Sequence, residues 1–182
     1  ELGKFESSAG KKRQVLNAVI TKSKESANAR MVGGVCVSGD NPPAEKNMWE
    51  SPNYIQMVFQ DPESLQCQGL VLMHEYVEDG KKILTASINP SSTYLYSVDE
   101  KTLCQRIIET IGEFARSNDI DVVATSQNKA IRTNRTGGVF EGELDKHIGK
   151  VNKVFTFKDP QTFSYRPAYS QQNMDVIWQK TA

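Results

Sequence analysis

The sequence is poor in the residues that carry most metal and thiol chemistry. Its 182 residues include only two histidines and three cysteines, Cys36, Cys67 and Cys104, and it has no CxxC motif. This spacing favours neither a zinc cluster nor a disulfide framework. We therefore predict reduced thiols, a cytoplasmic setting and no metal site.

Long apolar runs and an excess of either charge are also missing. No stretch approaches the ~20 apolar residues that span a bilayer, so no membrane association is predicted. Lys and Arg together number 22, and Asp and Glu together also number 22. This balance of charge argues against bulk electrostatic binding to nucleic acid. The length suits a single domain over 1–182, with a loose start over 1–10. Because the chain begins without Met, we expect a piece of a larger protein, whose other domains would be partners.

The apolar residues follow helical spacing in three regions and strand spacing in seven. Asp79 and Gly80 separate two apolar runs, which is a strong hairpin signal. Ser97 and Glu100 have the spacing of a capping box at the start of a helix. The predicted helices are 11–29, 97–118 and 141–152, and the predicted strands are 31–37, 54–60, 69–77, 82–88, 121–126, 154–157 and 174–178.

Strand 82–88, helix 97–118 and strand 121–126 together predict a right-handed β-α-β crossover with two parallel strands. The other strands follow one another closely and favour antiparallel pairing. The sequence therefore predicts an α+β domain with a mixed, mostly antiparallel sheet that is flanked by helices.

The order of these elements resembles the fold of the GNAT family of N-acetyltransferases. Residues 69–90 resemble that family's central hairpin, and residues 97–118 resemble its pyrophosphate-binding helix. Residues 120–126 and Asn128–Arg132 resemble its fifth strand and the polar segment after it. The resemblance implies acyl transfer from a thioester carrier, acetyl-CoA or another acyl-CoA, to an amine.

The segment before helix 97–118 departs from the family pattern. The family places a Gln/Arg-x-x-Gly-x-Gly/Ala loop there, and backbone amides of that loop bind the pyrophosphate. Residues 91–97 contain no glycine and include the bulky Tyr94, Leu95 and Tyr96. Two functions follow: an acyltransferase with an atypical carrier site, or a degenerate, non-catalytic domain for binding or scaffolding a small-molecule or protein ligand.

A polar cluster follows strand 121–126, at the end of a parallel strand where α/β sheets tend to place ligands. Guanidinium groups bind carboxylates and phosphates through paired hydrogen bonds. The alternative is a solvated loop whose arginines pair with Glu141 and Glu143. For the carrier we predict contacts from Ser91, Ser92, Thr93, Asn128 and Arg132, and for an anion or substrate contacts from Asn134 and Arg135.

Two neighbouring residues of the hairpin, His74 and Glu75, are the candidate general bases. They alternate along a strand, so only one of them faces a given side of the sheet. His74 has a second interpretation, because Cys36 with His74 would form the nucleophile and base of a transglutaminase- or peptidase-like enzyme.

Overall fold

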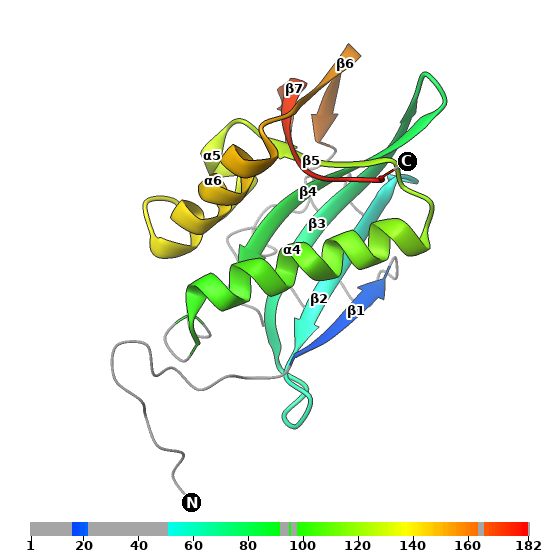
Figure 1. Ribbon diagram of the computed structural model, residues 1–182. Helices are drawn as coiled ribbons and strands as arrows, with labels where there is room; N and C mark the ends of the chain where they lie inside the picture. The colour runs from blue at the N-terminus through cyan, green and yellow to red at the C-terminus, as the bar shows by residue number, and fades with distance from the viewer. Residues whose placement is uncertain (1–15, 22–50, 92–94, 96–97, 164–165, 182) are drawn as a thin grey trace, which may run out of the picture.

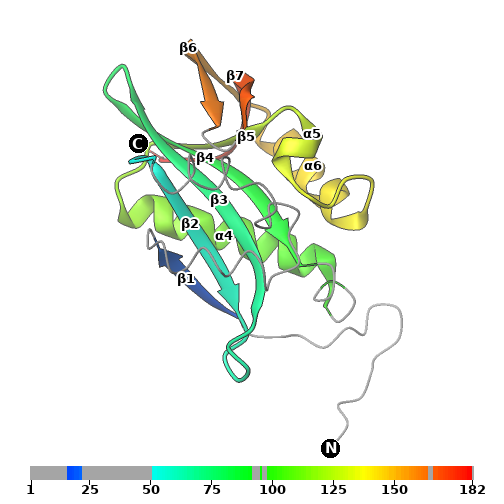
Figure 2. The ribbon, with the colours of Figure 1, turned by 180° about the vertical axis from the view of Figure 1, so that it is seen from behind.

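The computed structural model describes residues 16–21, 51–91, 95, 98–163 and 166–181 (Figures 1 and 2). Within these ranges the chain forms a seven-stranded sheet and three helices. None of the described helices combines the length and the apolar character that a membrane span needs.

The sheet order is β1-β2-β3-β4-β5-β7-β6, and the pair β4–β5 is parallel while the other pairs are antiparallel. This confirms the predicted α+β class with a mixed, mostly antiparallel sheet. The elements are β1 Asn17–Thr21, β2 Tyr54–Gln60, β3 Cys67–Glu78, β4 Lys81–Pro90, α4 Glu100–Ser117, β5 Val122–Ser126, α5 Lys129–Arg132, α6 Val139–Val151, β6 Val154–Phe163 and β7 Arg166–Gln179.

The helix predicted over 11–29 is wrong at residues 17–21, which form β1. Val19 and Ile20 are β-branched, and β1 pairs with β2 in a register that sets Ile20 opposite Met57. With so few apolar residues, the spacing is compatible with either a helix or a strand, and pairing with β2 decides between the two. The rest of that predicted helix lies outside the described residues, as does the predicted strand 31–37.

The central hairpin is confirmed, with β3 and β4 longer than predicted. Asp79 and Gly80 both have positive φ, 51° and 75°, as a tight two-residue hairpin turn requires. The Nζ atom of Lys158 on β6 lies 2.6 Å from a carboxylate oxygen of Asp79, so the hairpin tip is tied to the far edge of the sheet.

Helix α4 begins three residues later than predicted, and the capping-box prediction is wrong. Asp99 is the N-cap, and its side chain accepts a hydrogen bond from the Thr102 amide at 3.1 Å. Glu100 reaches away from its own helix and accepts from the amide of Phe140 at 3.0 Å. An aspartate caps a helix as well as a serine does, so Asp99 can serve as the N-cap that was predicted at Ser97. Ser97 itself lies outside the described residues.

The last two strands are also longer than predicted, because residues expected in a loop belong to β6 and β7. The ladder between them shifts register between Thr156 and Gln161, around Pro160. Proline has no amide hydrogen to donate, and it is tolerated on β6 because that strand is at the edge of the sheet.

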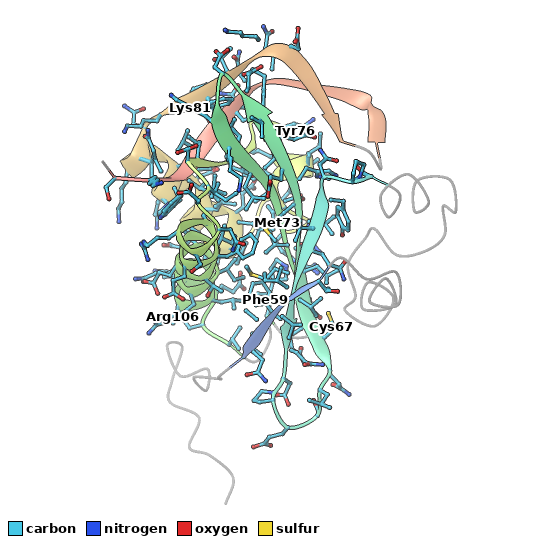
Figure 3. All side chains as sticks on the ribbon, turned by 90° about the vertical axis from the view of Figure 1, so that its right-hand side faces the viewer. Phe59, Cys67, Met73, Tyr76, Lys81 and Arg106 are labelled. Carbon is cyan, nitrogen blue, oxygen red and sulfur yellow. The ribbon has the colours of Figure 1, made fainter. Side chains whose placement is uncertain are left out.

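Helix α4 packs across one face of the sheet (Figure 1). Phe59 and Met73 point from the sheet toward this helix in Figure 3, where they belong to a core with Ile107 and Ile111. The opposite face carries a second buried cluster, which includes Tyr54, Leu70, Leu72, Ile83 and Phe157. Burial of alternate residues on both faces explains why β2, β3 and β4 are almost continuously apolar.

Gly112 of α4 and Gly142 of α6 form a matched pair for testing the packing of α4. A Cβ at Gly112 would lie 2.7 Å from Cδ1 of Trp178, whereas one at Gly142 would meet nothing within 4 Å. We predict that Gly112→Ala destabilises the domain, because overpacking costs about 1–3 kcal/mol. Gly142→Ala should stabilise it by about 0.5–1 kcal/mol through helix propensity alone. Urea unfolding monitored by tryptophan fluorescence measures both, and equal gains in stability would contradict the predicted contact.

Candidate functional site

The parallel strands β4 and β5 separate near their carboxyl ends. They pair only over Ile83–Thr85 and Val122–Ala124, and then the Thr125 hydroxyl donates to the Ala86 carbonyl at 2.8 Å. Strand β5 ends at Ser126, whereas β4 continues to Pro90. This is the place where open sheets with parallel strands bind ligands, and most of the predicted site residues lie around it.

Asn128 caps the short helix α5, which follows β5. Its side-chain oxygen accepts from the Ala130 amide at 3.0 Å, and its own amide donates to the Ser126 hydroxyl at 3.0 Å. Asn128 was predicted to contact a carrier, and here its side-chain oxygen contacts the protein's own backbone.

Arg132 is buried, with 5% of its surface exposed, and its guanidinium contacts three elements. Nε donates to the Ser126 carbonyl at 2.9 Å, Nη1 lies 2.5 Å from Asp145 of α6, and Nη2 lies 2.5 Å from Asp175 of β7. The loop alternative paired the arginines with Glu141 and Glu143, but the actual partners of Arg132 are these two aspartates. These two carboxylates neutralise the positive charge of Arg132, which an anionic ligand would otherwise bind.

Residues 133–135, which we call the strap, lie along the last residues of β4. Thr133 forms a parallel bridge with Ile88, and the Asn134 amide donates to the side-chain oxygen of Asn89 at 3.0 Å. Nε of Arg135 and Nδ2 of Asn134 both donate to the Pro90 carbonyl, at 2.9 and 3.4 Å. Just before the strap, the Ser87 hydroxyl donates to the Ile131 carbonyl at 2.5 Å. The strap therefore covers the part of the β4 edge that β5 leaves.

Two of the protein's own carboxylates occupy amides at the start of α6. The Gly137 amide donates to Oε2 of Glu141 at 2.6 Å, and the Phe140 amide donates to Oε2 of Glu100 at 3.0 Å. Oε1 of Glu141 lies 3.7 Å from Nζ of Lys129. The amides at the start of a helix attract anions, and here the attracted anions are internal side chains.

Ser91 is buried at the end of β4. Its amide donates to the Gln68 carbonyl at 2.9 Å, and its carbonyl accepts from the Leu95 amide at 3.2 Å. The β3 backbone approaches closely here, since a Cβ at Gly69 would lie 2.8 Å from Cα of Pro90. The other two predicted carrier residues, Ser92 and Thr93, lie outside the described residues.

His74 and Glu75 lie on opposite faces of the sheet, as their alternation predicts. His74 has no exposed surface and lies between the rings of Tyr54 and Tyr76, with centroid distances of 5.4 and 6.3 Å. Burial lowers the pKa of His74 to about 4, so its imidazole is neutral at pH 7. Glu75 is partly exposed, and its carboxylate lies 4.0 Å from Nζ of Lys82. Both residues belong to β3, whereas the contacts of the strap described above are with β4.

The structure also assigns roles to acidic residues that the sequence prediction missed. Asp145, Asp175 and Glu100 neutralise or cap the predicted anion-binding groups. Glu100 was predicted in a capping box of its own helix, and the only sequence signal for the two aspartates was the equal number of acidic and basic residues, which does not show which charges meet.

A solved structure supports the fold. No family model matches the sequence, and no curated protein matches it. Among solved structures, an aminoglycoside acetyltransferase from an uncultured soil metagenomic sample is 11% identical, covers 82% of this chain and 100% of its own, and aligns with a TM-score of 0.50. A chain from a KacTA–DNA complex is 7% identical, covers 88% of this chain and 94% of its own, and has a TM-score of 0.39, too low to add to the argument. The fold is therefore GNAT-like, which confirms the predicted resemblance and leaves the chemistry to the residues above.

Arg132 gives a prediction about stability. Removing one member of a buried ion pair leaves uncompensated charge and costs about 3–5 kcal/mol. We predict a loss toward the lower end of that range for Arg132→Ala in urea unfolding, because the buried guanidinium is removed and the half-buried Asp145 and Asp175 keep only Lys129 and Gln127 as side-chain partners among the described residues. The control is Arg106→Ala, which breaks an exposed pair with Glu109 and should cost about 0–1 kcal/mol. Comparable losses in the two variants would show that Arg132 is an ordinary surface charge.

The cysteines give a second prediction. Cys67 and Cys104 are buried, and burial raises the pKa of Cys67 and raises that of Cys104 to about 12. Because the thiolate is the reactive form, both should resist a disulfide reagent in the native protein and react after denaturation. Cys36 lies outside the described residues, so Cys36→Ser is the variant to test. Rapid labelling of this variant in its native state would contradict the burial of Cys67 and Cys104. In the wild type, slow reaction of the Cys36 thiol with the reagent would oppose a Cys36/His74 enzyme.

Proposed function

We propose that this chain is a GNAT-like domain that binds or scaffolds another molecule and does not transfer an acyl group. The observation that carries the proposal is the pair of carboxylates on Arg132. A guanidinium that meets Asp145 and Asp175 at 2.5 Å has little remaining attraction for the phosphates of a carrier. The described residues that would hold a carrier are engaged within the domain.

The fit of acyl-CoA to the described residues is poor. A pyrophosphate needs open backbone amides or cations, but the Ser91 amide and the Phe140 amide already donate to Gln68 and Glu100. The segment 91–99 contains no glycine that would let a backbone approach the phosphates closely. Acetyl-CoA or another acyl-CoA remains the carrier that the acyltransferase alternative requires.

The positions of the candidate bases also support a non-catalytic role. A general base has to lie within hydrogen-bond reach of the proton that it removes. His74 has no exposed surface, and its low pKa makes it a weak base at neutral pH. Glu75 lies on the other face of the sheet, where its register neighbour is Leu84 of the α4 core.

Thermal unfolding with acetyl-CoA and with free CoA tests this proposal. A ligand at 100 times its dissociation constant adds ~2.7 kcal/mol, which is roughly 5–11 °C for a domain of this size. We predict no shift with either compound and no release of CoA thiol in the presence of amine acceptors.

Inorganic pyrophosphate is the control ligand, because it separates general anion binding from recognition of the carrier. A shift with acetyl-CoA that pyrophosphate does not reproduce, together with thiol release, would overturn the proposal in favour of the acyltransferase. A shift with acetyl-CoA alone, without turnover, would contradict the absence of a carrier site.

A further inference from the structure

We propose that the carboxyl end of β4 is a docking edge for a short extended peptide, and that the strap, residues 133–135, is its internal occupant. The inference rests on the proposed binding function and names the partner of the site. The two halves of the β4 edge are covered differently. Over Ile83–Thr85 the partner is β5, in a regular parallel ladder, whereas beyond Ser87 the partner is the strap.

The strap is held mainly by side chains. Its backbone makes one bridge, between Thr133 and Ile88. The other contacts with β4 involve the side chains of Asn89, Asn134 and Arg135. A regular strand would instead offer a backbone amide or carbonyl at each step, so the strap satisfies this edge less completely than β5 satisfies its own half.

Local features mark the strap as the less stable part of the site. Oδ1 of Asn134 is buried without a hydrogen-bond partner among the described residues, and a buried acceptor in that state costs free energy. Within the strap Thr133 is buried and Asn134 and Arg135 are half-buried, whereas residues 136–139 directly after it are exposed and Gly137 has a φ of +77°. Segments with exposed backbone and few buried contacts open at lower free energy than the core around them.

Two fixed points limit the opening to the strap itself. Before it, the contacts of Arg132 with Ser126, Asp145 and Asp175 hold α5 in place. After it, the carboxylate of Glu100 holds the Phe140 amide at the start of α6. Residues 134 and 135 can therefore leave β4 while α5 and α6 keep their positions. Release of Thr133 also breaks the hydrogen bond of its amide to the Lys129 carbonyl, 3.2 Å at the end of α5, and full opening exposes the backbone of residues 88–90.

The geometry of the edge defines the partner. An extended peptide could add to residues 88–90 through main-chain hydrogen bonds, as peptides do at other open sheet edges. It would run parallel to β4, since the bridge that it replaces is parallel. Its donors would face the Asn89 side-chain oxygen and the Pro90 carbonyl, which now accept from the strap.

The experiment compares the wild type with the double variant Asn134→Ala, Arg135→Ala in the full chain. These changes remove two donors to the Pro90 carbonyl and leave Arg132 and Glu100 intact. We expect amide hydrogen exchange at position 134 to become at least tenfold faster, with no change at Leu84. The matched control is Thr136→Ala, an exposed neighbour of the strap, which should leave both rates unchanged.

The binding probe is a labelled peptide with the sequence of residues 131–138, Ile-Arg-Thr-Asn-Arg-Thr-Gly-Gly. We expect it to bind the double variant at least tenfold more tightly than the wild type, and a scrambled peptide to bind neither. Equal binding of the scrambled peptide would overturn the proposal. So would exchange at Asn134 that is as slow as at Leu84 in the wild type, a comparison that stands even if the variant fails to fold. Failure of the proposed function would appear separately, as a response to acetyl-CoA.

Discussion

The ion pairs of Arg132 with Asp145 and Asp175 determine the arrangement of the whole carboxyl end of the sheet. Burying a guanidinium costs several kcal/mol unless carboxylates and hydrogen bonds compensate for it, and here two carboxylates and the Ser126 carbonyl do so. Because Arg132 lies where the chain has just left β5, fixing its side chain fixes the return of the chain to β4. The same contacts attach α6 and β7 to the central parallel pair.

The site is therefore one in which the protein supplies its own ligands. Glu100 and Glu141 occupy amides that suit an anion, and the strap occupies a strand edge that suits an extended chain. This explains how a GNAT-like fold can keep the polar residues of a binding site while most of their hydrogen-bonding capacity is used internally. A fold of this class does not define the activity, which depends on whether such groups are available.

Local patterns in the sequence predicted the fold well, since the hairpin around Asp79 and Gly80, helix α4 and strand β5 all depend on neighbouring residues. They failed at β1, where pairing with β2 decides the structure, and at the start of α4, where Asp99 is the cap. The polar cluster was visible because Asn128, Arg132, Asn134 and Arg135 are close in sequence. The partners of Arg132 were not, because Asp145 and Asp175 lie 13 and 43 residues away and only the folded sheet brings them to it.

The irregular edge strand β6 has a consequence for how the protein behaves at high concentration. An exposed, regular edge is a template on which other chains can add strands and aggregate. Strand β6 interrupts its ladder around Pro160, which has no amide hydrogen, and the Lys158 amide already donates to the side chain of Glu78 at 2.8 Å. A second chain would find an incomplete row of donors along this border, so growth of the sheet from one molecule to the next is discouraged there.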